Sequence, residues 1–568
     1  MKPTAAIDLL AQARAWLAED PDPDTRAELT ALLAAAEGEA DEQHARAWSE
    51  LASRFSGTLQ FGTAGLRGEM GAGPMRMNRA VVIRAAAGLA AHLKREAAHG
   101  LVVIGYDARH KSYEFARDTA AVMVGAGLSA ALLPGPLPTP VLAFAVRHLD
   151  AAAGVMVTAS HNPPRDNGYK VYLGGALEGS QIVPPYDAAI AARIAEVGAL
   201  EQVPLATEGW ELLAEAEILE PYLARAAALV DPHAPRDLSV VYTPLHGVGR
   251  DTLLAAFKRA GFPTPSTVAA QGDPDPDFPT VGFPNPEEPG AMDLAFRAAA
   301  TLGPDIVLAN DPDADRLAVA VPDPAADSGW RMLRGDEVGA LIAEHLVGRR
   351  AAGTFATTIV SSSLLSRIAA SAGLGYAETL TGFKWISRAE GLRYGYEEAL
   401  GYCVDPDAVR DKDGVSAALA VAELAADLKA SGRTLSDLLD DLAVTHGLHA
   451  TEQLSVRVAD LRLIADAMAR LRARPPAELA GLRVDSVEDL EQGGAGLPPT
   501  DGLRYRLSGG AVDAARVVVR PSGTEPKLKC YLEVVVPVGT ADALSRARAT
   551  ADELLAALKH DLAAAGGF

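Results

Sequence analysis

Short apolar runs alternate with longer stretches of helical spacing through the middle of the chain. The runs are rich in β-branched residues and predict buried strands, whereas the stretches that follow predict amphipathic helices. The pairs are 101–107 with 113–127, 238–244 with 250–261, and 356–362 with 363–373. Because strand followed by helix recurs, the pattern predicts repeated α/β domains with parallel strands.

The two ends of the chain have a different pattern. Residues 5–55 are rich in Ala, Leu and Glu with helical spacing broken at 20-DPDPD-24, which predicts two or three helices. From about residue 452, strands alternate with helices in a way typical of an α+β domain on an antiparallel sheet. The predicted strands are 453–458, 515–520 and 528–536, and the predicted helices lie near 459–473 and 539–565.

A chain of 568 residues is long enough for about three to five domains. The expected fold class is α/β, with three similar α/β domains on mixed sheets followed by the α+β domain. The expected segments are a helical N-terminal extension (1–45), three α/β domains (46–215, 216–325 and 326–450) and the C-terminal domain (451–568).

Composition narrows the class of partner. The chain has 74 acidic and 52 basic residues, a net charge of -22, which disfavours nucleic acid. Cys403 and Cys530 offer no disulfide framework, so we expect a reducing compartment. Polar residues interrupt the apolar ones behind Met1, and no apolar run is long enough to span a bilayer. We therefore expect a cytoplasmic protein that binds neither nucleic acid nor membrane.

A potential nucleophile and two proton carriers share the segment 158-TASHNPPRDNGYK-170, which is crowded with turn-forming residues. Ser160, His161 and Lys170 follow the apolar run 151-AAAGVMV-157, which predicts a buried strand. The segment therefore predicts a reactive loop at the end of a strand.

Three carboxylates lie between two apolar strands in 305-DIVLANDPDADRLAVAV-321. Asp311, Asp313 and Asp315 alternate along the chain, so in an extended segment they point the same way and favour a hard cation such as Mg²⁺. A calcium EF-hand is excluded because its glycine and glutamate positions are missing. The alternative is an ordinary surface turn, which is our interpretation of 273-DPDPD-277, where no strand follows.

The segment 520-RPSGTEPKLK-529 gathers anion-binding groups in one turn between two predicted strands. Arg520 offers a bidentate fork, Ser522 and Thr524 offer hydroxyl groups, Gly523 exposes backbone N–H groups, and Lys527 adds charge. The spacing is not that of a Walker A loop. A basic loop that only faces solvent is the alternative.

Taken together, these segments resemble the α-D-phosphohexomutase superfamily, in particular its phosphoglucomutase/phosphopentomutase branch. The resemblance spans roughly residues 45–535, and the motifs follow one another in the family's order. They are 60-QFGTAGLRG-68, 158-TASHNPPRDNGYK-170, 311-DPDADR-316, 381-TGFKWI-386, 397-EEALGY-402, 410-RDKDG-414 and 520-RPSGTE-525.

The resemblance implies four domains around a central cleft and a phosphoserine at Ser160. It implies that the phosphoryl group on Ser160 joins Asp311, Asp313 and Asp315 in binding Mg²⁺, and that a sugar bisphosphate serves as intermediate and activator. It also implies that Lys170 is the general acid/base and that Arg67 stabilises the transferring phosphate. For His161, proton transfer and a structural role in orienting the loop stay open.

Recognition of the substrate is also implied by resemblance. Sugar-binding residues would be Thr381, Gly382, Glu397 and Glu398, and phosphate-binding residues Arg316, Lys412, Arg520, Ser522, Gly523, Thr524 and Lys527. Ala399 departs from several branches, which have serine there, and this puts their sugar preference in doubt for this chain.

The leading hypothesis is a phosphosugar mutase that interconverts glucose 1-phosphate and glucose 6-phosphate. Within the family, a phosphopentomutase or phosphomannomutase is the alternative. Outside it stand a Mg²⁺-dependent sugar phosphatase and a non-catalytic sugar-phosphate sensor. The sequence leaves the choice between monomer and dimer open.

Overall fold

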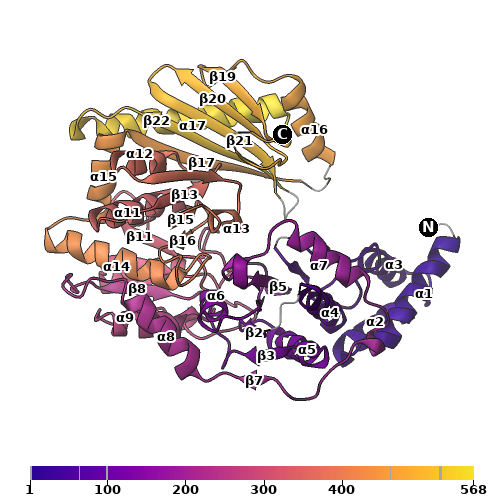
Figure 1. The fold of residues 1–568 in the computed structure, drawn as a ribbon. Coiled ribbons are helices and arrows are strands. Elements are labelled where there is room, and N and C mark those ends of the chain that lie inside the picture. Colours follow the sequence, from indigo (N-terminus) through magenta and orange to yellow (C-terminus); the bar gives the residue numbers. More distant parts are fainter. Residues whose placement is uncertain are drawn as a thin grey trace. The chain divides into compact units, whose positions relative to one another are not determined.

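The computed structural model describes residues 3–62, 64–96, 100–458, 460, 462–494, 496–522 and 527–568. Two compact units are formed from discontinuous segments (Figure 1). The first unit contains residues 1–332 and 403–423, and the second contains residues 333–402 and 424–568. No helix in the described ranges combines the length and apolar character needed to cross a membrane.

Three helices open the chain, as the sequence predicts: α1 (Pro3–Glu19), α2 (Pro23–Ala36) and α3 (Glu42–Arg54). The break at 20–24 is an N-cap, because the Asp22 carboxylate accepts the Asp24 N–H and Pro23 begins α2. These helices are fastened to the rest of the first unit by polar contacts. Glu28 accepts the Ala72 N–H at 2.8 Å, and Lys111 pairs with Asp24 at 2.6 Å.

The first α/β sheet has the strand order β1-β5-β4-β2-β3-β7, with β6 paired to β5. Strands β2, β3, β4 and β7 are parallel, and β5 is antiparallel to β4 and β1, so the sheet is mixed as expected. The strands are β1 (Leu66–Glu69), β2 (Leu101–Tyr106), β3 (Ser129–Leu132), β4 (Ala153–Val157), β5 (Asp166–Leu173), β6 (Ser180–Gln181) and β7 (Glu211–Leu212).

Helices cover both faces of this sheet, which explains why its central strands are continuous apolar runs. Val102 and Ile104 of β2 share a core cluster with α4 and α5, whereas Gly105 lies against Leu142 of α6 on the opposite face. The helices are α4 (Arg79–Arg95), α5 (Ser112–Gly125), α6 (Thr139–His148), α7 (Tyr186–Ala195) and α8 (Glu215–Ala227).

The second sheet, also in the first unit, has the order β12-β11-β10-β8-β9. Its parallel centre is β9, β8 and β10, and β11 and β12 add antiparallel strands. The elements are β8 (Val240–Thr243), α9 (Gly249–Arg259), β9 (Ser266–Thr267), α10 (Asp293–Leu302), β10 (Ile306–Ala309), β11 (Ala318–Pro322) and β12 (Trp330–Met332).

The third sheet has the order β14-β13-β15-β16 and again a parallel centre. Its strands are β13 (Thr354–Thr358), β14 (Gly375–Thr379), β15 (Leu392–Glu397) and β16 (Gly401–Cys403). The accompanying helices are α11 (Gly335–Gly348), α12 (Leu364–Ser371), α13 (Phe383–Ile386), α14 (Gly414–Ala430) and α15 (Leu435–His446).

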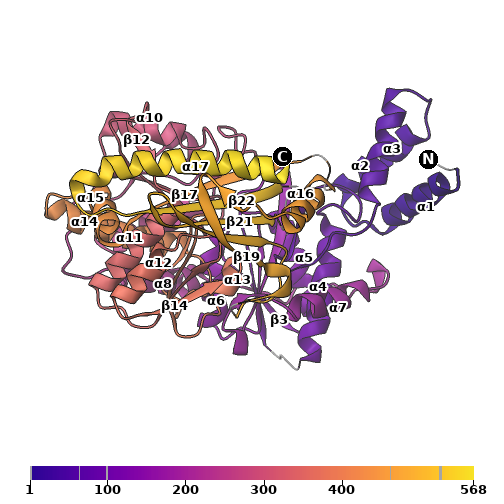
Figure 2. The same cartoon turned by 90° about the horizontal axis from the view of Figure 1, so that it is seen from above.

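The C-terminal sheet is antiparallel throughout, as predicted for an α+β domain. Strands β18 to β22 lie side by side in chain order, and β17 pairs with β22 at the edge of the sheet. The strands are β17 (Leu448–Arg457), β22 (Lys527–Val536), β21 (Val512–Pro521), β20 (Leu503–Gly509), β19 (Leu482–Asp489) and β18 (Glu478–Leu479). Helix α16 is Arg462–Ala473, and α17 (Leu544–Gly566) lies along the sheet in Figure 2. Strands β18, β19 and β20 were not predicted from the sequence.

Candidate functional site

The Ser160 loop begins where β4 ends, and its backbone is sharply bent. Ser160 has a φ of 51°, in the left-handed region that side chains other than glycine rarely adopt. Its N–H donates to the Thr158 hydroxyl at 2.8 Å, and only 3% of the residue is exposed. A non-glycine residue is held in this conformation only when its surroundings fix it, and such residues concentrate at functional sites.

Arg109 supplies much of that constraint, and sequence reasoning missed it. Its guanidinium, which is buried just beyond β2, donates to backbone carbonyls of the Ser160 loop. The accepting carbonyls are those of Ser160 at 2.6 Å, Asn162 at 2.6 Å, Pro163 at 2.8 Å and Asp166 at 3.1 Å. The available signal was an Asp-Ala-Arg segment immediately after the apolar run 101–106.

The acidic loop connects β10 to β11, and Ala314 in its middle also has a positive φ, of 53°. The glycine-rich turn 245–250 supports this loop from the neighbouring strand. The Val248 N–H donates to the Pro312 carbonyl at 2.8 Å. A Cβ added at Gly247 would lie 2.3 Å from Pro312 Cα, so only glycine permits this approach. The turn leads directly into α9, which begins at Gly249.

The structure brings the serine loop and the acidic loop together within the first unit. The Ser160 hydroxyl donates to Asp311 Oδ2 at 2.7 Å, although 151 positions separate the two residues. Thr139, at the start of α6, donates its hydroxyl to Asp313 Oδ2 at 2.6 Å. Because the mechanism implied by the sequence requires Ser160 near these carboxylates, this proximity is its central geometric condition.

Two lysine ammonium groups oppose the buried acidic charge. Lys170 Nζ lies 2.7 Å from Asp313 and 2.9 Å from Asp315, and Lys412 Nζ lies 3.0 Å from Asp315. Burial acts to lower the pKa of Lys170, but Asp313 and Asp315 outweigh burial and raise the pKa above its usual value. Burial and the charges of its two acidic neighbours raise the pKa of Asp311 well above the usual range.

The acidic triad fits a divalent metal ion. One ligand oxygen from each of Asp311, Asp313 and Asp315 lies within 4.8 Å of the others, and all three residues are 0% exposed. Asp313 Oδ1 and Asp315 Oδ1 are buried without a hydrogen-bond partner among the described residues, which is costly unless a cation binds there. Oxygen ligands of this kind suit Mg²⁺. In the 273–277 segment, by contrast, Asp273 pairs with Arg250 and Asp277 lies 2.8 Å from His110.

His161 contacts Ser160, and Arg67 contacts the Ser160 loop. His161 Nδ1 is 3.1 Å from Ser160 Oγ and 3.9 Å from Asp311 Oδ2. Burial and the nearby charges of Arg316 and Arg67 lower the pKa of His161 well below its usual value, so the ring is neutral at neutral pH. Arg67 Nε is buried and lacks a hydrogen-bond partner in the described part of the chain. It is therefore available to an anion.

The second unit carries the residues expected to recognise the sugar. Glu397 is the last residue of β15 and is 8% exposed. The Glu398 carboxylate accepts hydrogen bonds from the Ser361 hydroxyl at 2.9 Å and the Thr358 hydroxyl at 3.1 Å. Gly382 has a φ of 106°, which glycine adopts easily, and Thr381 precedes it before α13 begins.

The expected phosphate loop is described in part. Arg520 and Ser522 lie at the end of β21 and just beyond it, and the Ser522 N–H donates to the Lys527 carbonyl at 2.8 Å. Burial raises the pKa of Tyr531. The charges of Glu398 and Glu397 raise it further, and Arg520 opposes the rise. Gly523 and Thr524 lie outside the described residues.

The second unit also contains an acidic residue with a shifted pKa, Asp336. Asp336, in the first turn of α11, accepts the Ser362 N–H at 2.7 Å and the Tyr396 hydroxyl at 3.1 Å. Burial raises the pKa of Asp336 to about 7, and Glu398 and Glu533 act in the same direction. Asp336 is therefore protonated in the folded protein under mildly acidic conditions.

A serine held against buried carboxylates that suit Mg²⁺, on repeated α/β domains, is the arrangement of a phosphoryl-transfer enzyme. Four family models of phosphoglucomutase/phosphomannomutase match the chain in succession: α/β/α domains I, II and III at residues 58–200, 220–324 and 334–445, and the C-terminal domain at 454–551. The chain belongs to this phosphohexomutase family. It is an enzyme, an isomerase that acts as an intramolecular phosphotransferase.

Individual relatives carry different names. A "Probable phosphomannomutase" of Haemophilus influenzae is 48% identical and covers 81% of this chain and 93% of its own. A phosphopentomutase of Mus musculus is 35% identical, covering 96% of this chain and 93% of the relative. A phosphoglucomutase of Staphylococcus epidermidis is 34% identical, with coverages of 84% and 91%.

Among solved structures, one from Thermus thermophilus matches with a TM-score of 0.68 at 26% identity, covering 89% of this chain and 99% of that one. The phosphoglucomutase parafusin from Paramecium, in its open form, matches with a TM-score of 0.67 at 18% identity, covering 91% and 97%. The latter likeness concerns the fold alone.

The acidic triad can be tested by direct metal binding. In Asp311→Asn, one carboxylate of the triad is lost, and we expect the affinity for Mg²⁺ or Mn²⁺ to fall by at least about tenfold. Calorimetry with Mg²⁺ and electron paramagnetic resonance with Mn²⁺ measure this without an activity assay. Asp277→Asn, from the other Asp-Pro segment, is the matched control. Equal loss of affinity in both variants would contradict the assignment.

The raised pKa of Asp336 predicts a pH-dependent stability. Between pH 4 and 7 the unfolded carboxyl group ionises while the folded one stays protonated, so its contribution falls as pH rises, by up to about 4 kcal/mol. We expect Asp336→Asn to lose this pH dependence, as measured by urea unfolding at pH 5 and pH 8. The exposed Asp466→Asn is the control. An unchanged pH slope in Asp336→Asn would rule this out.

Proposed function

We propose that the protein is a phosphosugar mutase in which Ser160 carries the phosphoryl group, with glucose 1-phosphate and glucose 6-phosphate as its substrate pair. The observation that carries the proposal is the 2.7 Å hydrogen bond from the Ser160 hydroxyl to Asp311, within a buried triad of carboxylates. Such a cluster has little structural value without a cation, because buried like charges repel one another.

In the proposed reaction, phospho-Ser160 donates its phosphoryl group to the free hydroxyl of the sugar monophosphate. The Ser160 Oγ–P bond breaks, a P–O bond to the sugar oxygen forms, and in the net step the phosphoryl group replaces the proton of the sugar hydroxyl while a proton is regained on Ser160 Oγ. The product is a sugar bisphosphate. Its other phosphoryl group then returns to Ser160, so the enzyme regains its phosphoserine and the phosphate has moved between C1 and C6.

The residues around Ser160 have distinct roles in this proposal. The neutral ring of His161, 3.1 Å from Ser160 Oγ, exchanges a proton with the serine oxygen. Lys170 holds Asp313 and Asp315 in place, and its assignment as the acid/base for the sugar oxygen stays a prediction. Arg67, with its buried unpaired Nε, stabilises negative charge on the transferring phosphoryl group.

Asp311, Asp313 and Asp315, with a phosphoryl oxygen on Ser160, would hold Mg²⁺, which offsets the charge that develops in phosphoryl transfer. A sugar bisphosphate is proposed as activator, because it rephosphorylates Ser160 when the intermediate escapes. Arg316 and Lys412, beside Asp315, extend positive charge around the transferring group.

Substrate recognition is assigned to the second unit. Glu397 and Glu398 accept hydrogen bonds from adjacent sugar hydroxyls, with Thr381 and Gly382 nearby in the chain. Arg520, Ser522, Gly523, Thr524 and Lys527 bind the phosphate that is not being transferred.

A pentose phosphate is the second candidate substrate. The Mus musculus relative named phosphopentomutase matches 96% of this chain, a larger share than the 84% covered by the Staphylococcus epidermidis phosphoglucomutase. The Haemophilus influenzae relative named probable phosphomannomutase supports a mannose phosphate through its sequence identity of 48%.

The role of Ser160 predicts both a covalent mark and a loss of activity. Intact-mass analysis is expected to show a fraction of the protein one phosphoryl group heavier, mapped to Ser160. Ser160→Ala removes the acceptor, so mutase activity falls by at least about a thousandfold. The exposed Ser56→Ala is the control. Wild-type activity in Ser160→Ala would refute the proposal.

The substrate is tested by a side-by-side assay of glucose, mannose, ribose and deoxyribose 1-phosphates. We expect the highest kcat/KM for glucose 1-phosphate, a dependence on Mg²⁺ and a rise in rate with catalytic glucose 1,6-bisphosphate. A higher value for a pentose phosphate would move the assignment to phosphopentomutase. Release of inorganic phosphate without isomer formation would instead identify a phosphatase.

A further inference from the structure

A five-residue loop, 359–363, joins β13 to α12 in the second unit and lies between the sugar-recognition residues and the C-terminal sheet. On one side its Ser361 holds Glu398: the Ser361 hydroxyl donates to Glu398 Oε2 at 2.9 Å and accepts the Glu398 N–H at 3.2 Å. Both the side chain and the backbone of Glu398 are therefore oriented by one buried serine, which is 1% exposed.

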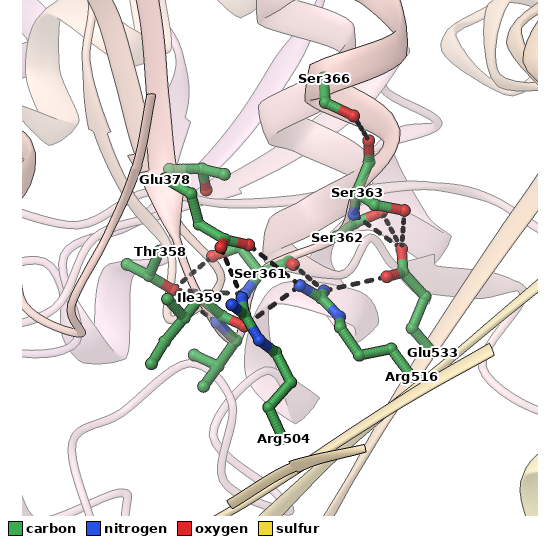
Figure 3. Close-up of polar contacts among 12 residues, drawn as sticks. Thr358, Ile359, Ser361, Ser362, Ser363, Ser366, Glu378, Arg504, Arg516 and Glu533 are labelled. Atoms are coloured by element: carbon green, nitrogen blue, oxygen red, sulfur yellow. Dashed lines mark hydrogen bonds and ion pairs between the residues drawn. The ribbon is translucent and has the colours of Figure 1, made fainter. Parts of the chain in front are cut away.

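On the other side, Arg516 of β21 forms hydrogen bonds with the backbone of the same loop (Figure 3). Its guanidinium donates to the Ile359 carbonyl at 3.1 Å and, through Nη2, to the Ser361 carbonyl. The two carbonyls precede Val360 and follow Ser361, so the planar fork of the guanidinium fixes the path of the chain on both sides of the Ser361 side chain.

Glu533 of β22 completes the attachment. One of its oxygens pairs with Arg516 at 2.9 Å, and the other accepts the Ser362 hydroxyl at 2.8 Å and the Ser363 N–H at 2.7 Å. Burial acts to raise the pKa of Glu533, but Arg516, His449 and the Ser362 hydroxyl together outweigh burial and lower the pKa to about 2. The pair is therefore charged across the physiological pH range.

We propose that Arg516 is a positioning residue for substrate recognition, which acts through the backbone of loop 359–363 and the Ser361 hydroxyl to orient the carboxylate of Glu398. This inference rests on the proposed function, because it assigns Glu398 to the sugar. It goes beyond that function because it gives two charged residues of the C-terminal sheet, Arg516 and Glu533, a role in holding loop 359–363.

Arg504 provides an internal comparison. It lies on the neighbouring strand β20, is 1% exposed, and pairs with Glu378 at 2.6 Å, as Arg516 pairs with Glu378 at 3.4 Å. Its other hydrogen bonds go to Glu488, on β19. Arg504 thus matches Arg516 in charge and in its pairing with Glu378 of β14, but it binds the Glu488 side chain instead of the loop backbone. The Arg516 side chain is slightly more exposed, at 12%.

The test compares Arg516→Lys with Arg504→Lys. Lysine keeps the charge and loses the bidentate fork, so we expect Arg516→Lys to raise KM for glucose 1-phosphate by about tenfold with kcat within about twofold. In Arg504→Lys, both constants stay within about twofold. Hydrogen exchange of the 359–363 amides, measured without sugar, is expected to quicken only in Arg516→Lys.

Coupling to Ser361 separates positioning from general destabilisation. If Arg516 acts through Ser361, Arg516→Lys adds little to the rise in KM of Ser361→Ala, since the two belong to one path. Independent, multiplicative effects on KM would overturn the inference, as would equal effects of Arg516→Lys and Arg504→Lys. Should Arg516→Lys fail to fold, Glu533→Gln, with nearly the same shape, replaces it in the same comparison.

Failure of the proposed function gives a different result. If the wild-type protein turned over none of the sugar 1-phosphates, the proposed function would fall. Calorimetry of glucose 1-phosphate and ribose 1-phosphate binding to Ser160→Ala, with and without Arg516→Lys, would still test the positioning role. Retained affinity in the double variant would overturn it.

Discussion

The hydrogen bond between the Ser160 hydroxyl and Asp311 is the interaction on which the rest of the site depends. It joins loops from two different sheets and places the serine hydroxyl against three carboxylates that have lost their contact with water. That concentration of negative charge is tolerable because Lys170 and Lys412 lie within 3.0 Å of its members, and because unsatisfied oxygens remain for a cation. In the proposed function, these charges act on the transferring phosphoryl group.

The scaffold explains how such a site is built inside a chain with a net charge of -22. Positive charge is concentrated locally, on arginine and lysine residues with little exposure, such as Lys170 within β5 and Arg109 just beyond β2. Arg109 is bonded to backbone carbonyls and Arg516 to a loop of the second unit, so these guanidinium groups shape loops as well as contribute charge. In both units, polar groups from a neighbouring element determine where a functional side chain points.

Much of this architecture is predictable from the sequence. The strand–helix alternation predicted the α/β domains, and the alternating aspartates after an apolar run predicted the acidic cluster that the structure contains. Local patterns could not reveal Arg109, because its partners lie more than fifty positions away and are backbone atoms. Strand β19 was missed because a β-bulge between Val484 and Ser486 interrupts its apolar–polar alternation in 482-LRVDSVED-489, whereas the regular alternation of 503-LRYRL-507 in β20 was an available signal. Arg516 reads as an ordinary strand residue until Glu533 and loop 359–363 are seen around it.

The positive φ angles of Ser160 and Ala314 have a thermodynamic consequence. Each costs of order 1–3 kcal/mol, and that cost is met when the chain folds, by the many contacts that hold the two loops. A ligand arriving at this place therefore finds atoms that need little rearrangement, and its own binding energy is not consumed in bending the backbone. The fold is therefore somewhat less stable than it would be without these two conformations, and the site is preorganised in return.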